Sequence, residues 1–288
     1  MKKILGIMVG VLLTATSVYA GNVDNVTSQS AQFIRAAARQ ASTDVDAAYY
    51  NPSGLAKLTD GFYWEFSNLA ILKNDTLISG GISYAADNPV LLFPTLSLAY
   101  KSGSLASYFS FHVPGGGGSN HFYGHPLFNG SEAQVAAAGA EQSDFIDGAV
   151  IKNSEVFGSS MFLGASIGAV YDIAGVLSLS LGARAVSASK HYRANVTYGL
   201  TSTALGREAT SVTLEIDAEQ KALGFGAIAG LSFYPIDDLI FSFKYESSTA
   251  LEFTNKTNKD DVNFFPDGAK NQRDIPAFAT AGMSWEML

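Results

Sequence analysis

The chain has 288 residues, a formal net charge of −8 and a hydrophobic content of 47%, and it contains no cysteine. The net negative charge argues against nucleic acid as a partner, because phosphate binding needs clustered lysine and arginine. The absence of cysteine excludes a disulfide framework and thiol chemistry.

Residues 1–20 are organised like a secretory signal peptide. Lys2 and Lys3 form a positive start, residues 4–13 are apolar, and the small residues Val18 and Ala20 precede the expected cleavage point. We therefore predict export. An N-terminal membrane anchor is the less favoured alternative, because the apolar run is short for a spanning helix.

The next part of the chain, residues 21–60, has helical rather than strand character. The run "SQSAQFIRAAARQAS" at 28–42 favours a helix, with Ser28 or Ser30 as its N-cap. Residues 43–46, "TDVD", resemble a capping box in which Asp46 replaces the usual glutamate, and this pattern predicts a short second helix.

A tight turn is expected directly after that helix. Asn51 is a good N-cap, and Pro52 suits the first helical position because its missing N–H costs least there. Gly54 is expected to loosen the single helical turn that follows. The adjacent tyrosines Tyr49 and Tyr50, and the lack of charge up to Lys57, favour a packed environment.

From residue 61 onward the hydrophobic period is two. In 177–186, for example, Leu177, Leu179 and Leu181 alternate with serine and glycine, which indicates a strand with one apolar and one small or polar face. Several such runs reach the 9–11 residues or so that a membrane-spanning strand needs. Strands are predicted at 61–72, 95–101, 105–113, 159–172, 176–193, 212–234, 239–254 and 275–287.

The predicted connections alternate in length, which is the asymmetry of an outer-membrane β-barrel. Short turns are expected at 102–104, 173–175 and 235–238, and long loops at 73–94, 114–158, 194–211 and 255–274. We therefore predict an all-β, antiparallel transmembrane β-barrel and rank it ahead of a secreted β-sandwich. Residues 21–60 then form either a periplasmic arm or, as the packing argument favours, a plug inside the barrel.

The stretch "DAAYYNPSGLA" at 46–56 resembles the hatch motif of the FadL-type outer-membrane transporters of long-chain fatty acids and aromatic hydrocarbons. That motif runs from alternating small and aromatic residues into Asn-Pro-Ala-Gly, and Ser53 here replaces the alanine. The resemblance continues through "DIPAFATAGMSW" at 274–285 and covers essentially the whole chain. It identifies Tyr49, Tyr50, Asn51, Pro52, Ser53 and Gly54 as the hatch motif.

The resemblance implies a signal peptide at 1–20, an N-terminal hatch at 21–60 that plugs the lumen, and barrel strands at 61–288. The family barrel has fourteen strands and the runs above supply about eight, which implies a chain that lacks its C-terminal strands. The implied activity is passive uptake of hydrophobic compounds across the outer membrane of a Gram-negative bacterium, with lateral exit and without enzyme activity or a cofactor. The implied surroundings are outer-membrane lipid, lipopolysaccharide and the barrel assembly machinery, and the expected state is a monomer.

Ligand-binding candidates follow from the needs of a fatty acid, which are an apolar slot and a cation for the carboxylate. Strand parity places Arg184 and Lys244 in the lumen as cations, with Phe162 and Val170 as apolar lining. Arg35 and Arg39 are candidates on the hatch. For each cation, solvation or an internal ion pair, such as Lys244 with Glu246, is the competing interpretation.

Other chemistries receive less support from the sequence. The histidines His112, His121 and His125 are interpreted as exposed loop residues rather than a metal site. The run "PGGGG" at 114–118 lacks the Gly-Lys-Ser/Thr of a phosphate loop and is expected to bend the chain at the barrel rim. The alternative functions are a structural or adhesive barrel that binds partners through its loops and, less favoured, an outer-membrane hydrolase.

Overall fold

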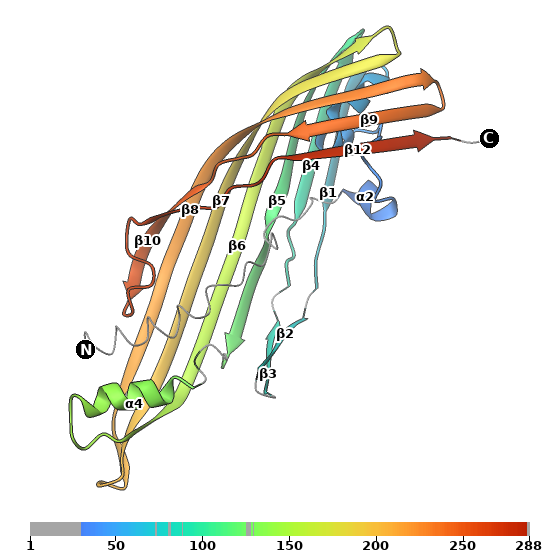
Figure 1. Ribbon diagram of the computed structural model, residues 1–288. Helices are drawn as coiled ribbons and strands as arrows, with labels where there is room; N and C mark the ends of the chain where they lie inside the picture. The colour runs from blue at the N-terminus through green and yellow to red at the C-terminus, as the bar shows by residue number, and fades with distance from the viewer. Residues whose placement is uncertain are drawn as a thin grey trace.

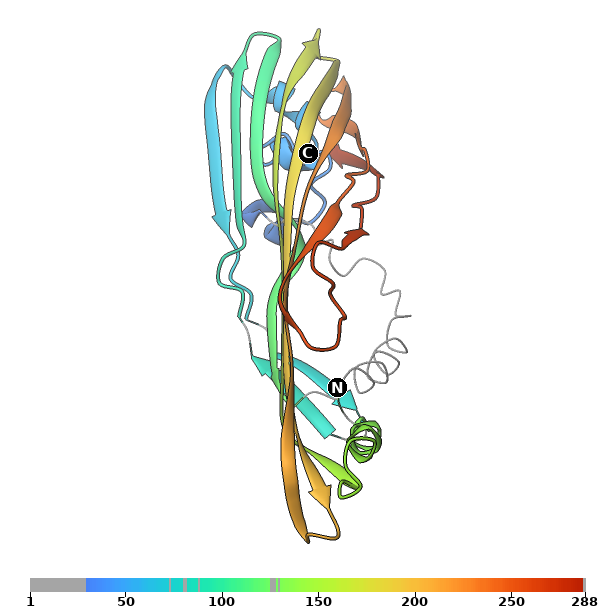
Figure 2. The same cartoon turned by 90° about the vertical axis from the view of Figure 1, so that its left-hand side faces the viewer.

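The computed structural model describes residues 30–72, 74–79, 82–87, 89–124, 128 and 130–286. The predicted signal peptide and residues 21–29 lie outside these ranges. The described chain forms one long, curved antiparallel sheet, with the N-terminal segment against its concave side near one end and a helix near the other (Figures 1 and 2).

We call this sheet the wall. It has eight strand positions side by side, as the alternating pattern predicted. Neighbouring strands follow the order β1-β4-β5-β6-β7-β8, and β8 then pairs with both β9 and β10. β12 pairs with β9 and β11 pairs with β10, so each of the last two positions holds two strand segments. The strands at the first six positions of the wall are β1 (Gly61–Asn68), β4 (Pro94–Ser102), β5 (Leu105–Tyr123), β6 (Gly148–Ile173), β7 (Leu177–Ser202) and β8 (Arg207–Ile236). The remaining four are β9 (Leu239–Glu246), β10 (Glu252–Asp260), β11 (Lys270–Gln272) and β12 (Phe278–Trp285).

The three short turns are confirmed, but all four predicted long loops contain strand residues. β5 and β6 extend into the region 114–158, and β10 and β11 occupy part of 255–274. The region 194–211 is a hairpin in which β7 continues to Ser202 and β8 begins at Arg207. The loop at 73–94 contains a separate hairpin of β2 (Asn74–Ser79) and β3 (Ile82–Asp87). Central strands of 26 to 30 residues therefore extend well beyond a spanning length.

The glycine run at 114–118 lies inside β5 rather than at a rim. The pairing of β5 with β6 shifts between His112 and Gly115 and again between Gly115 and Gly118, which marks two irregular sites in the ladder. Gly116 has φ +88°, and a Cβ there would lie 2.5 Å from the Ser160 carbonyl oxygen. The glycines therefore allow β-bulges that distort the strand without ending it.

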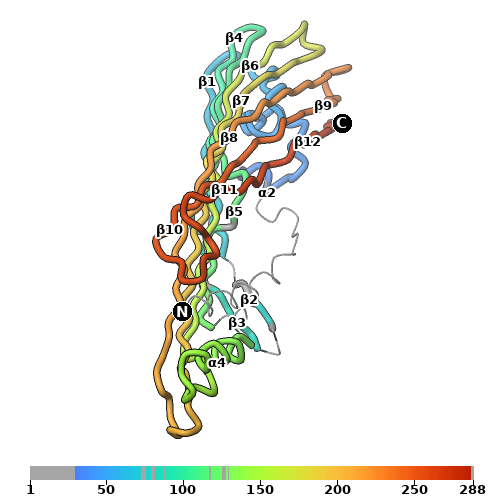
Figure 3. Tube along the Cα trace, turned by 60° about the vertical axis from the view of Figure 1, so that its left-hand side comes forward, coloured from blue at the N-terminus to red at the C-terminus, as the bar shows by residue number. Residues whose placement is uncertain are grey.

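The seventh wall position is interrupted where a single strand, 239–254, was predicted. β9 ends at Glu246 and β10 begins at Glu252, and an isolated bridge joins Thr249 to Ile275 between them. Glycines face this break on β8, since a Cβ on Gly224 would lie 2.2 Å from the Ala250 carbonyl oxygen. Figure 3 shows β9 and β12 at one end of the molecule and β10 and β11 farther along it.

The outer face of the sheet changes from apolar to polar along the strands. On β6, β7 and β8 the apolar part runs from the paired row Tyr171, Leu179 and Leu231 to the row that holds Leu163 and Leu223. This part spans about nine residues on each strand, the length that crosses the apolar core of a bilayer. Beyond it the same face carries charged pairs, of which His191 with Asp217 at 2.7 Å is one.

The helices are short. Ser30 caps α2 (Ala31–Arg35) by accepting from the Phe33 N–H at 3.0 Å, which confirms one predicted N-cap, although the helix is much shorter than the run 28–42. α3 (Ala47–Tyr50) is followed by a 3₁₀ helix, η1 (Pro52–Lys57), and α4 (Glu132–Ala140) lies at the far end of the sheet. No helix among the described residues is both long and apolar enough to cross a membrane.

Candidate functional site

The turn after α3 docks on a row of serines in the sheet. Ser178, Ser232 and Ser242 are register partners on β7, β8 and β9, so their hydroxyls lie side by side on the concave face. The Ser53 hydroxyl lies 2.7 Å from that of Ser232, and the Ser178 hydroxyl donates to the Ser53 carbonyl oxygen at 2.8 Å. Neutral hydrogen bonds of this kind hold the turn in a fixed place against the wall.

The local structure of the turn follows from its sequence. As predicted, Asn51 is the N-cap of η1, and its side-chain oxygen also accepts from the Ser53 hydroxyl at 2.7 Å. At Gly54 the structure shows a steric requirement for glycine that the sequence analysis did not foresee. A Cβ at Gly54 would lie 1.9 Å from the Ser42 carbonyl oxygen, so glycine is needed because two stretches of backbone touch there.

Two of the predicted ligand cations, Arg184 and Lys244, lie on the concave face and share one carboxylate. Lys244 Nζ donates to Glu246 at 2.6 Å, and Arg184 Nη1 forms an ion pair with the other oxygen of Glu246. Lys244 also donates to the Tyr49 carbonyl oxygen at 2.9 Å, while Arg184 Nη2 donates to Thr249 Oγ1 at 2.8 Å. Lys244 therefore binds the N-terminal segment, and Arg184 binds the break between β9 and β10.

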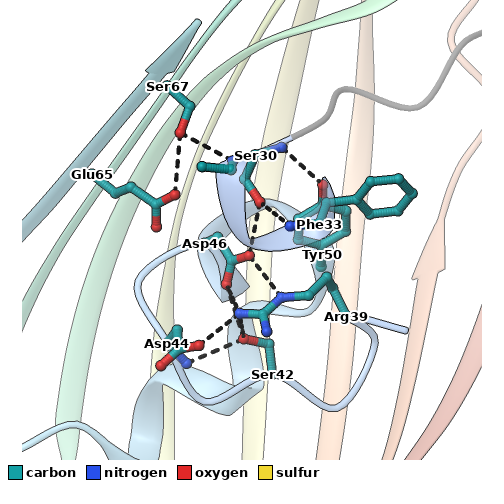
Figure 4. A network of polar contacts seen from close by, with 10 residues as sticks. Ser30, Phe33, Arg39, Ser42, Asp44, Asp46, Tyr50, Glu65 and Ser67 are labelled. Atoms are coloured by element: carbon teal, nitrogen blue, oxygen red, sulfur yellow. Dashed lines mark hydrogen bonds and ion pairs between the residues drawn. The ribbon is translucent and has the colours of Figure 1, made fainter. Parts of the chain in front are cut away.

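Arg39 binds Asp46 rather than facing an open space, and Arg35 is exposed at the end of α2. Arg39 Nη2 and Nε donate to the two carboxylate oxygens of Asp46 at 2.6 and 2.9 Å (Figure 4). Burial opposes the charge, but the hydrogen bonds that Arg39 donates to Asp46 and Asp44 prevail and raise the pKa of Arg39 above its ordinary value. The predicted capping box is wrong, because the Asp46 side chain forms no cap hydrogen bond and accepts these donors instead.

The two apolar candidates lie in different clusters. Val170 packs against Ala47, Leu55 and other residues of the N-terminal segment, which covers it. Phe162 belongs to a buried cluster farther along the concave face, which we call the inner cluster. Its members are Phe162, Val186, Ala188, Ala222, Leu251, Phe253 and Ile275.

Lys190 is a cation that the sequence analysis missed. Its side chain is almost fully buried, and its ammonium group lies 5.6 Å from the Phe162 ring centre and 5.5 Å from that of Phe253. Strand parity provides the signal that could have identified it, because Lys190 shares the inward face of β7 with Arg184. The inner cluster thus combines apolar side chains with a cation, which is the combination that a fatty acid needs.

A cavity of about 470 Å³ adjoins this part of the concave face. Tyr192 and Phe265 stack at 5.1 Å between ring centres on its lining, and Gln220, the register partner of Lys190, also lines it. Beyond it, toward α4, a second buried cluster contains Phe128, Val135 and Tyr198. The cavity between these two apolar clusters has a mixed lining, with aromatic residues such as Phe265 and polar residues such as Asn255 and Arg273.

The interpretation of the histidines as loop residues is wrong where the structure describes them. His112 and His121 both lie in β5, and His112 is almost fully buried with its ring 4.5 Å from that of Tyr49. His125 lies outside the described residues. Within the described ranges, no group of three or more histidine, aspartate or glutamate side chains is placed to hold a metal ion.

Comparison with known proteins gives structural matches only. No protein-family profile and no curated protein sequence matches the chain. The Ralstonia pickettii toluene transporter TbuX matches with a TM-score of 0.56 at 16% identity, over 85% of this chain and 64% of that one. A Pseudomonas aeruginosa FadL homologue matches with a TM-score of 0.55 at 14% identity, over 92% and 66%. The Pseudomonas putida toluene transporter TodX matches with a TM-score of 0.52 at 18% identity, over 85% and 63%.

The chain thus spans a little under two thirds of the length of these solved structures. At these identities the similarity concerns the fold. It confirms the fold that the hatch-like motif implied: the chain has the fold of the FadL-type outer-membrane transporters.

Proposed function

We propose that this chain belongs to a channel for passive uptake of hydrophobic compounds across the outer membrane of a Gram-negative bacterium. The observation that carries the proposal is a buried apolar cluster on the otherwise largely polar concave face, behind a wall whose outer face carries an apolar band. An outward apolar band suits lipid, whereas the concave face of a water-filled pore would be polar. Here that face carries the inner cluster, with Phe253 at 1% exposure and Leu251 at 0%.

In this proposal residues 21–60 act as the hatch. The motif from Tyr49 to Gly54 holds the hatch on the wall through the serine row and Lys244. Lys244 then holds the hatch and Arg184 holds the break between β9 and β10, whereas Lys190 is the cation nearest the apolar site. Phe162 contributes to the ligand pocket, whereas Val170 is exposed to ligand only when the hatch moves.

The proposed cargo is a hydrophobic compound such as a long-chain fatty acid or an aromatic hydrocarbon. It enters near α4, passes the cavity beside Tyr192 and Phe265, and reaches the inner cluster. Lateral exit into the membrane is favoured energetically, because an apolar molecule gains nothing by entering periplasmic water. The proposal requires no cofactor, catalytic group or energy source, and it places the protein as a monomer among outer-membrane lipid and lipopolysaccharide after insertion by the barrel assembly machinery.

The test is uptake of labelled oleate and labelled toluene by cells that produce the protein. Phe253→Glu places a carboxylate in the inner cluster beside Lys190 and should reduce uptake at least about tenfold, because it replaces apolar surface with a charged group and competes with a fatty acid for the ammonium group. Thr254→Glu is the matched control, because the neighbouring side chain points to the exposed face. Uptake equal to that of vector-only cells for both compounds would refute the proposed function.

A further inference from the structure

The N-terminal segment is held in two different ways along its length. Its inner part, from Ala47 to Ala56, is buried almost throughout and docks on the serine row. Its outer part, Ser30–Ala38, which we call the strap, contains α2, and no residue of that helix is buried. The two parts therefore differ in how much free energy their release from the wall would cost.

The strap is anchored at one end. Gln40 accepts through its side-chain oxygen from Thr280 Oγ1 at 2.8 Å and through its carbonyl oxygen from Asn51 Nδ2 at 3.2 Å. Gly282 of β12 leaves room for this residue, because a Cβ there would lie 2.7 Å from Gln40 Cβ. Residues 39–42 thus stay with the wall and the inner part even if the strap moves.

The other end of the strap is held by a few contacts around Ser30. The Ser30 hydroxyl donates to Asp46 Oδ2 at 3.0 Å, and its backbone N–H donates to the Tyr50 hydroxyl at 3.3 Å. The Phe33 ring stacks on Tyr50 with 5.6 Å between ring centres. The Ala31 N–H donates to Ser67 Oγ of β1 at 3.2 Å, so the clasped strap also contacts the wall (Figure 4).

Asp46 connects the two ends. Its carboxylate is 2% exposed and accepts from Ser30 at one end of the strap, from Arg39 at the other, and from Ser42 Oγ at 2.9 Å. A buried carboxylate needs such a set of donors, and each donor is held in place by the charge. Loss of the charge would loosen Ser30 and Arg39 together, while the inner part keeps its serine contacts.

We propose that Asp46 is the positioning residue of a clasp that holds the strap closed, and that the strap opens while the inner part stays docked. This inference rests on the proposed function, in which movement of the hatch admits the ligand. It assigns that movement to Ser30–Ala38 alone. Asp46 positions the strap through Ser30 and Arg39 and does not itself contact the cargo.

The test measures distances by electron paramagnetic resonance in the full chain reconstituted in lipid. The protein has no cysteine, so spin labels attach only where cysteine is introduced. One pair, Ile34→Cys with Ser104→Cys, joins the strap to the β4–β5 turn. A second pair, Lys57→Cys with Ser104→Cys, joins the end of the inner part to the same turn, and all three positions are exposed.

Asp46→Asn should broaden the distance distribution of the strap pair and raise its open fraction about ten- to hundredfold, the loss expected when a buried charged hydrogen bond is removed. The inner pair should keep its narrow distribution. Asp44→Asn is the matched control, because Asp44 also binds Arg39 but its side chain is 62% exposed, so both pairs should stay unchanged. In the unaltered protein, added oleate should broaden the strap pair only.

A strap pair that stays narrow in Asp46→Asn overturns the proposal, and so does broadening of both pairs together. If Asp46→Asn does not fold, Ser30→Ala carries the same test, because it removes only the strap's hydroxyl. Since the distances are measured without transport, failed uptake would refute the proposed function and leave the clasp standing.

Discussion

The close contact at Gly54 gives a prediction whose size follows from the structure. Gly54→Ala places a Cβ 1.9 Å from the Ser42 carbonyl oxygen, which is far inside van der Waals contact. Gly54 is not among the residues with positive φ, so the effect is steric only. Two stretches of backbone must separate, and overpacking of this kind costs about 1–3 kcal/mol.

A cost of this size would increase the undocked fraction of the inner part about 5- to 150-fold. The assay is hydrogen exchange of the backbone amides from Ala47 to Lys57, which are protected while the 3₁₀ helix is docked. Ala56→Gly is the comparison, because it removes a methyl group without creating a clash. If Gly54→Ala keeps the protection of the unaltered protein, the close approach of the two backbones is not rigid and the reasoning fails.

Three further predictions concern the wall and the ligand. Lys190→Met should lower oleate uptake about tenfold relative to toluene uptake, because only oleate has a carboxylate to pair with the ammonium group; an equal loss for both compounds would contradict this. Glu246→Gln leaves the cations of Arg184 and Lys244 without their shared carboxylate and should destabilise the fold by about 3–5 kcal/mol. The assay is the heat-modifiable folded band in electrophoresis, which should be lost, and an unchanged band would argue against the shared ion pair. Gly116→Val should reduce the yield of folded protein through its clash with Ser160, whereas Gly206→Val in an open turn should have a smaller effect. Equal yields of the two variants would show that the β5 bulge tolerates a side chain.

Much of the wall was predictable, because the alternation of apolar with small or polar residues along each strand can be recognised in a single sequence. Lipid on one side and packed residues on the other impose a period of two, and the short turns interrupt it sharply. The predicted strand 176–193 was too short, because the pattern changes beyond about residue 193 for a physical reason. There the outer face leaves the apolar band and becomes polar, as at Asn195 and Thr197, so the strand no longer resembles one that lies in lipid.

The site was less predictable, because its key contacts join residues that are distant in sequence. The signals around Asn51 and Pro52 identified the turn, since caps act locally. The roles of Asp46 and Gly54 depend on Arg39 and Ser42, which approach them only through the fold of the segment. Parity placed Arg184 and Lys244 on the inner face, and the competing interpretation of an ion pair between Lys244 and Glu246 is confirmed. The sequence could not show that Arg184 shares the same carboxylate.

The inner part is held on the wall by contacts of two kinds, which are serine hydroxyls and one lysine. A hydroxyl that loses its partner can form hydrogen bonds with water, so each Ser53 contact contributes only about 0.5–1.5 kcal/mol to docking. A buried charge that loses its partner is far more costly, which is the situation of Lys244 toward the Tyr49 carbonyl oxygen. Lys244 keeps its bond to Glu246 when that carbonyl leaves, so the wall never holds an uncompensated cation. Together these contacts keep the inner part docked in the proposed mechanism, and the clasp at Asp46 is the step that limits how often the strap opens.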